Sequence, residues 1–251
     1  MKFKLPVYTL KKRADVCRWK QDSKTIEFLR TVKELKGGGI ADWLKLIDRS
    51  KSSTFQELCA LSNSNFRRGG FFVEFGALDG LKGSNSWMLE NDYNWRGILA
   101  EPQKSCQTAL RQNRQCHIDT RCVWGSSGEQ ILFTENDNKI SSGITKTLTK
   151  PAQKHSKKWN TRTYSVETIS LNDLLTRYSA PQYIDYISID TEGSEFNILS
   201  TFDFNNWRFG FISVEHHFQP QRQSINKLLT AHGYRRTNTD LSGIDDWYIS
   251  E

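Results

Sequence analysis

Short apolar runs alternate with turn-and-helix patterns through the second part of the chain. The first run, residues 71–75, leads into a glycine turn at residues 76–80, and a helical pattern begins after the polar residues 84–86. Apolar runs of this length are typical of buried strands, and serine and asparagine favour a helix N-terminus. A second apolar run, residues 97–100, ends at Glu101. The pattern therefore predicts a strand–turn–helix–strand unit, around which the rest of the chain is arranged.

The runs that follow predict the remaining elements of one sheet. Strands are expected at residues 116–118, 121–124, 166–169, 183–190 and 209–214, with a hairpin at 130–134 and an antiparallel terminal pair at 234–238 and 246–249. Helices are expected over residues 106–110, after Ser170, after Gly193 and at residues 221–231. Strands that alternate with helices predict an α/β fold with a mostly parallel sheet.

The first 64 residues begin with a basic, irregular arm (residues 1–22), and helical patterns follow it. We expect one helix over residues 26–35 that Ser23 caps, a second over 41–47, and a third that the capping box of Thr54 and Glu57 opens. The polar residues 62–65 then suggest a boundary. The chain is thus predicted to have a helical N-terminal extension (residues 1–64) and an α/β domain (residues 65–251). The extension could pack on the domain, cover its mouth or form a homodimer contact.

Composition narrows the class of protein. The chain has 251 residues and a net charge of +7, which favours acidic partners without choosing among nucleic acid, anionic lipid and acidic sugars. Five cysteines without a C-x-x-C pair argue against a disulfide framework and a structural zinc site. Because no apolar run approaches a membrane span and no signal-peptide core follows Met1, we expect a cytoplasmic protein.

The glycine turn has the features of a nucleoside-binding site. Gly76 and Gly80 let the backbone pass close to a ligand, and Glu101 follows near the roughly 20-residue spacing expected of a ribose-binding acid. The pyrophosphate motif G-x-G-x-x-G is absent, and Glu74 and Asp79 would repel a diphosphate. These carboxylates suit the sulfonium and ammonium groups of S-adenosylmethionine instead. The alternative is a structural turn with no ligand.

Three groups of residues carry a resemblance to a known family. Residues 71–80 (FFVEFGALDG), 84–90 and 95–102, then 185–195 and 214–217, resemble in order the signatures of the FkbM family of S-adenosylmethionine-dependent methyltransferases. The similarity runs from about residue 66 to about residue 233. It implies a Rossmann-like class I methyltransferase fold, with a mostly parallel seven-stranded sheet, helices on both faces and an antiparallel final strand.

The resemblance also implies a set of cofactor-binding residues. They are Glu74, Gly76, Ala77, Asp79, Gly80, Ser84, Asn85, Glu101, Pro102 and Asp190. In class I methyltransferases the segment after the third strand lines the adenine, which adds Asp119, Cys122 and Val123 as candidates. Asp119 could equally be an ordinary turn residue.

The chemistry of methyl transfer to a hydroxyl points to the ends of the later strands. A hydroxyl needs a general base or a cation that lowers its pKa. The candidate catalytic residues are His216, His217, Asp190 and Glu215, and only one of the two histidines should face the pocket because strand neighbours alternate. Alternatively, Asp190, Glu192 and Glu215 could bind a divalent cation such as Mg²⁺.

Residues 139–165 contain seven lysine and arginine residues and no acidic one. This stretch is either a solvated loop or a mobile lid that meets an anionic acceptor. From the resemblance we expect O-methylation of a sugar hydroxyl in a glycan, sugar nucleotide or glycosylated metabolite. The alternatives are an RNA or lipid-headgroup acceptor, or a non-catalytic binding module; DNA is not expected as a partner.

Overall fold

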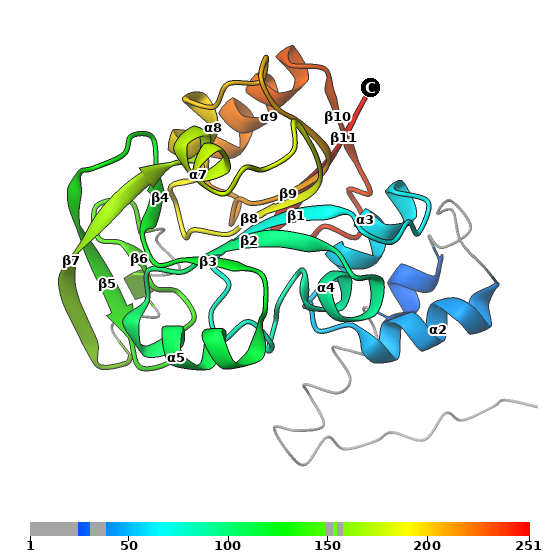
Figure 1. The fold of residues 1–251 in the computed structure, drawn as a ribbon, viewed down its shortest axis with the longest axis horizontal. Coiled ribbons are helices and arrows are strands. Elements are labelled where there is room, and N and C mark those ends of the chain that lie inside the picture. The colour runs from blue at the N-terminus through cyan, green and yellow to red at the C-terminus, as the bar shows by residue number, and fades with distance from the viewer. Residues whose placement is uncertain (1–24, 31–38, 149–152, 155–157) are drawn as a thin grey trace, which may run out of the picture.

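The computed structural model describes residues 25–30, 39–148, 153–154 and 158–251 (Figure 1). Several expectations from the sequence lie outside these ranges. They are the cap at Ser23, residues 31–35 of the first helix, Cys17, and Lys150 and Lys157 of the basic stretch.

A seven-stranded sheet forms the centre of the molecule. Its strands are β1 (Phe71–Phe75), β2 (Arg96–Ala100), β3 (His117–Asp119), β8 (Tyr183–Ile189), β9 (Arg208–Glu215), β10 (Tyr234–Thr237) and β11 (Asp245–Ser250). Their order is β10-β11-β9-β8-β1-β2-β3, and β11 runs antiparallel to both of its neighbours. The predicted methyltransferase-like sheet, with its antiparallel last strand, is confirmed.

Helices cover both faces of this sheet, as predicted. Successive residues of β1 show why, since Phe72 packs into one core and Val73 into the other. One face is covered by α7 (Leu171–Arg177), α8 (Glu195–Ser200) and α9 (Gln221–Ala231). The other is covered by α4 (Trp87–Tyr93), α5 (Lys104–Asn113) and the N-terminal helices.

The N-terminal helices share the second of these cores. Helix 25–30, α2 (Ile40–Arg49) and α3 (Gln56–Asn63) place Phe28, Trp43 and Leu58 in one cluster with Phe72. The predicted domain boundary between residues 64 and 65 remains a prediction. The capping box was wrong: the N-cap of α3 is Phe55, which makes no side-chain capping bond. Glu57 instead accepts hydrogen bonds from Ser50 and Ser52, because the preceding turn brings these hydroxyls to its carboxylate.

A second sheet of four strands lies beside the first. Its strands, in the order β4-β7-β5-β6, are β4 (Cys122–Trp124), β7 (Thr161–Ser170), β5 (Gln130–Asn136) and β6 (Gly143–Ile144). The expected strands at 116–118 and 121–124 exist with shifted bounds, but the second belongs to this separate sheet.

The largest correction to the predicted elements concerns residues 161–165, which were assigned to an irregular basic stretch. They form the first half of β7 and pair with β5 along its whole length. Threonine and tyrosine favour strands, but residues 161–165 lack the apolar positions by which a strand is predicted. Across the described residues, no helix is long and apolar enough to cross a membrane.

Candidate active site

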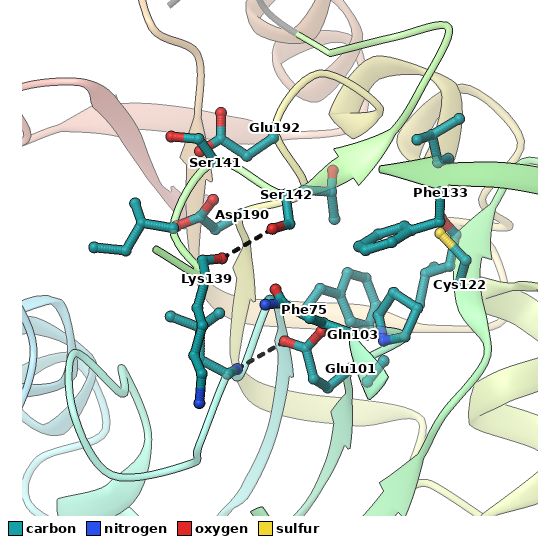
Figure 2. Close-up of a pocket in the computed structure, with 18 residues that line it drawn as sticks. Phe75, Glu101, Gln103, Cys122, Phe133, Lys139, Ser141, Ser142, Asp190 and Glu192 are labelled. Atoms are coloured by element: carbon teal, nitrogen blue, oxygen red, sulfur yellow. Dashed lines mark hydrogen bonds between the residues drawn. The ribbon is translucent and has the colours of Figure 1, made fainter. Parts of the chain in front are cut away.

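A pocket lies where the carboxyl ends of β1, β2 and β8 face the second sheet (Figure 2). It holds about 620 Å³ of empty space and is open to solvent. An apolar wall comes from both sheets, and acidic side chains converge from the strand ends. The apolar lining includes Phe75, Ala100, Cys122, Val123, Phe133 and Ile144, and the acidic lining is Glu101, Asp190 and Glu192. The ends of parallel strands are the usual ligand site of such sheets.

Gly76 allows two strand ends to meet under this pocket. Its φ is +74°, and a Cβ atom at this position would lie 2.2 Å from the backbone oxygen of Asp190. Any side chain would therefore force β1 and β8 apart. Gly80, with φ +73°, is required for a different reason, because a Cβ there would meet Leu110 and Arg114 at 2.6 Å. Gly76 lines the pocket, whereas Ala77 and Gly80 lie outside its lining.

Glu101 is held at the end of β2 with its carboxylate at the pocket. Its side chain is buried, and its two oxygens accept hydrogen bonds from the backbone N–H groups of Leu78 (2.7 Å) and Gln103 (2.8 Å). Each carboxylate oxygen has two lone pairs, so one on each oxygen stays available for a ligand. Burial raises the pKa of Glu101 to about 7, although these two N–H groups act in the opposite direction.

Glu74, the other carboxylate beside the turn, lies outside the pocket lining. It accepts hydrogen bonds from the hydroxyls of Ser84 (3.1 Å) and Ser86 and from the backbone N–H of Asn85 (2.8 Å). The guanidinium of Arg114, 3.8 Å away, adds an ion pair. Glu74, Ser84 and Asn85 thus fasten the glycine turn and the start of α4 to β1.

Asp79 and Asp119 also lie outside the lining. Asp79 accepts hydrogen bonds from the N–H groups of Leu81 and Lys82, which shapes the turn. Asp119 accepts hydrogen bonds from Arg121. Burial raises the pKa of Asp119, but its hydrogen bonds with Arg121 prevail and hold the pKa below the usual range. Of the residues expected near the adenine, Pro102 and Cys122 do line the pocket.

Four titratable side chains from the ends of β8 and β9 meet at one side of the pocket. Nε2 of His217 lies 2.8 Å from Oε1 of Glu215 and 3.4 Å from Oε2 of Glu192. The carboxyl of Asp190 contacts that of Glu215. Burial, followed by repulsion from neighbouring carboxylates, raises the pKa values of Asp190 and Glu215 well above their ordinary range. The hydrogen bond with Glu192 raises the pKa of His217.

The two adjacent histidines point to different surroundings. His216 is buried, its Nδ1 accepts a hydrogen bond from the N–H of Phe218, and its Nε2 lies 3.6 Å from Oδ1 of Asp246. His217 is half-buried and belongs to the acidic cluster. The structure therefore places His217, and not His216, beside the pocket-lining carboxylates.

Sequence reasoning missed several residues of the lining. They are Leu78, Gln103, Phe133, Ile140, Ser141, Ser142, Ile144 and Thr191. Most come from β5, β6 and the segment between them, which reach the pocket only because the second sheet packs against the first. Lys139 of the predicted basic stretch also lines the pocket.

Comparison with known proteins identifies the family. The profile of the FkbM methyltransferase domain matches residues 74–236, which include the end of β1, the glycine turn, Glu101 and the acidic cluster. This chain belongs to the FkbM methyltransferase family. The FkbM chain is accordingly an S-adenosylmethionine-dependent methyltransferase. Among curated proteins, no sequence matches it.

Solved structures similar to the FkbM chain include two whose sequences are only 12% identical to it. Precorrin-6y C5,15-methyltransferase from Geobacter metallireducens GS-15 has a TM-score of 0.41, with 72% of this chain and 71% of that chain covered. A point mutant of MtNAS in complex with S-adenosylmethionine has a TM-score of 0.37, with 94% and 74% covered. Neither structure informs the acceptor of the FkbM chain.

The pocket residues fit the methyl donor that the family uses. Phe133, Cys122 and Pro102 offer an apolar wall to an adenine ring. Glu101 offers two free acceptor positions, and Asp190 after β8 adds carboxyl oxygens that can accept hydrogen bonds from an ammonium group. The absence of a side chain at Gly76 lets this ligand approach the backbone. The observed donors, charges and walls thus suit S-adenosylmethionine.

The raised pKa of Glu101 predicts a pH dependence of cofactor binding. The charged carboxylate is the form that accepts two hydroxyl hydrogen bonds, so below pH 7 a proton must be lost on binding. We expect the affinity for S-adenosylhomocysteine to be about tenfold lower at pH 6 than at pH 8, because one pKa unit corresponds to about 1.4 kcal/mol. Calorimetry at these pH values measures the difference. Glu101→Gln should remove it, and an equally flat profile in the wild type would contradict the assignment.

Proposed function

We propose that this FkbM methyltransferase transfers the methyl group of S-adenosylmethionine to a sugar hydroxyl of a glycan, sugar nucleotide or glycosylated metabolite. The observation that carries O-methylation is the cluster of Asp190, Glu192, Glu215 and His217 beside the cofactor pocket. A hydroxyl is a poor nucleophile until its proton is removed, and this cluster supplies groups that hold protons. The sugar acceptor comes from the resemblance of the sequence motifs to the family.

In this proposal Glu101 accepts hydrogen bonds from the two ribose hydroxyls of the cofactor. The backbone N–H groups of Leu78 and Gln103 donate hydrogen bonds to its carboxylate and hold it at the pocket, which supports this role. Pro102, Cys122 and Phe133 surround the adenine. Such preorganisation keeps the reacting groups in place before the acceptor enters.

Asp190 is proposed as the group that takes the acceptor proton. It lines the pocket and also contacts the acidic cluster, so a hydroxyl at the pocket can reach it. The cofactor, when bound, supplies an electrophilic methyl group on a sulfonium. Transfer of this methyl group to the acceptor oxygen would release the thioether, and the Asp190 carboxylate would take the hydroxyl proton.

Basic and aromatic side chains near the pocket support an anionic acceptor. Nζ of Lys104 lies 4.4 Å from the ring centre of Tyr164, and Nζ of Lys146 lies 4.5 Å from that of Trp124. Lys139 lines the pocket itself. These cations would attract a phosphate or a carboxylate on the sugar, and aromatic rings suit the apolar face of a sugar ring.

An RNA or lipid-headgroup acceptor is the main alternative. RNA binding favours several exposed aromatic side chains interleaved with basic ones. Within the described part of residues 139–165, Trp159 is the one exposed large aromatic. This observation favours the sugar.

We keep the cytoplasm as the proposed compartment, because the described cysteines are free thiols, as expected of a reducing environment.

A transfer assay tests the proposal. Purified protein is incubated with methyl-labelled S-adenosylmethionine and with neutral sugars, uronic acids, sugar nucleotides, RNA and phospholipid vesicles. We expect label in a sugar class, with the anionic members preferred. Label in RNA or lipid alone would overturn the sugar assignment, and cofactor binding without transfer to any acceptor would favour a binding module.

The role of Asp190 has its own test in this assay. Asp190→Asn should lower kcat by about 10²- to 10⁴-fold, the usual contribution of a general base, without a comparable loss of acceptor binding. Asp240→Asn is the matched control, because Asp240 is exposed in the turn before β11. Equal kcat values for the Asp190 variant and the control would contradict the role of Asp190.

A further inference from the structure

Three side chains beside Asp190 have the geometry of a cation site. Glu192 follows β8, Glu215 ends β9 and His217 lies two residues further along. One potential ligand atom from each of them lies within 4.8 Å of the others. Although they come from two separate turns, their ligand atoms converge beside the pocket, where Glu192 is part of the lining.

Glu215 provides an independent sign that something is bound there. Its side chain is buried, with 6% of the residue exposed, and Oε1 contacts His217 at 2.8 Å. Its other oxygen, Oε2, is fully buried and has no hydrogen-bond donor among the described residues. Leaving a buried acceptor unsatisfied costs about 1–3 kcal/mol, and more for a charged group. A bound cation would satisfy this oxygen.

The charges around Glu215 point in the same direction. Its carboxyl has Asp190 as a neighbour, and Glu192 is a third acidic group near His217. Buried charges of one sign are unfavourable unless an opposite charge is present. A protonated His217 would balance only one of them, whereas a divalent cation would balance two.

We propose that Glu192, Glu215 and His217 bind a divalent cation of the Mg²⁺ and Mn²⁺ class at the edge of the cofactor pocket. Two carboxylates and one imidazole suit these hard or borderline ions, and no thiolate is present to select zinc. The inference rests on the proposed function and deepens it. Glu192 also lines the pocket, so a cation held there would polarise an acceptor hydroxyl and ease the loss of its proton to Asp190.

Titration with Mn²⁺ tests the site. Protein treated with a chelator and then dialysed is titrated with MnCl₂, and free Mn²⁺ is measured by electron paramagnetic resonance. We expect one saturable site per chain, competition by Mg²⁺, and at least about tenfold weaker binding in His217→Ala and Glu192→Gln. The matched control is His232→Ala, since His232 lies before β10, at the end of the sheet away from Glu215, and stacks on Phe204.

The result that overturns the cation site is an absence of saturable Mn²⁺ binding, or equal binding by the wild type and both variants. Thermal unfolding establishes whether each variant is folded. Because the two substitutions are made in separate proteins, one variant still tests the site if the other does not fold. Calorimetry with S-adenosylhomocysteine on His217→Ala separates the two proposals. In that variant, retained cofactor binding with weakened Mn²⁺ binding is the expected result. Cofactor binding by the wild type without saturable Mn²⁺ binding would disprove the cation site alone, whereas Mn²⁺ binding without methyl transfer to any sugar would disprove the proposed acceptor alone.

Discussion

Replacing Glu101 by alanine is expected to weaken the binding of S-adenosylmethionine and S-adenosylhomocysteine by at least about 100-fold. Two hydrogen bonds from ribose hydroxyls to a charged group are lost, each worth about 1.5–3 kcal/mol. The carboxylate is buried at the end of β2 and keeps free acceptor positions toward the pocket. Isothermal calorimetry on both ligands measures the loss.

The alanine variant also leaves the N–H groups of Leu78 and Gln103 without their acceptor. Glu101→Gln is therefore the second variant, because its amide keeps the shape and one acceptor. We expect it to bind the cofactor at least about tenfold more weakly than wild type, through loss of one charged hydrogen bond. Glu167→Gln, at a half-exposed carboxylate on β7, is the control. Wild-type affinity in a folded Glu101 variant would disprove the ribose assignment.

The second large effect is expected at Arg114. Its side chain is fully buried, and it donates hydrogen bonds to Glu90, to the backbone oxygen of Gly80 and to the hydroxyls of Ser84 and Ser86. Replacement by methionine leaves Glu90 and the nearby Glu74 without their buried cation. Removing one partner of a buried pair costs about 3–5 kcal/mol, so we expect the free energy of unfolding to fall by this amount.

Urea denaturation followed by circular dichroism measures the effect of Arg114→Met. Arg111→Met is a matched control on the same helix, because Arg111 is exposed to solvent. Since Arg114 fastens the turn after β1, the variant should also bind S-adenosylhomocysteine more weakly. Equal stabilities of the two variants would show that the turn is held by other contacts.

The central sheet could be predicted because its signals are local. Apolar runs of four to eight residues, each bounded by glycine or a polar turn, mark β1, β2, β8 and β9. The helix after Ser170 was also predictable, and Ser170 does accept a hydrogen bond from the N–H of Asp173. By contrast, the first half of β7 has an exposed, polar pattern, so its assignment depends on pairing with β5. Because pairing with β5 determines this part of the strand, its own residues carry little of the pattern that would predict it.

The candidate site was predictable as a set of residues but not as an arrangement. Glu74 precedes the turn and Glu101 follows the next strand, and either could bind a cofactor on chemical grounds. In the structure the carboxylate of Glu74 is surrounded by donors from residues 84–86, whereas Glu101 is directed to the pocket. Which acid keeps free lone pairs depends on packing between segments far apart in the chain.

The sequence by itself determined a glycine turn, an acid at the next strand end and an acidic, histidine-containing segment, since these features are local; their resemblance to the FkbM signatures implied the methyltransferase fold. Only the tertiary structure decided that His217 joins Glu192 and Glu215 while His216 turns to Asp246. The physical reason is that the chain leaves the strand conformation at His217, whose φ is +42°. Beyond that point strand alternation no longer predicts direction, and the surrounding elements set where the side chain points.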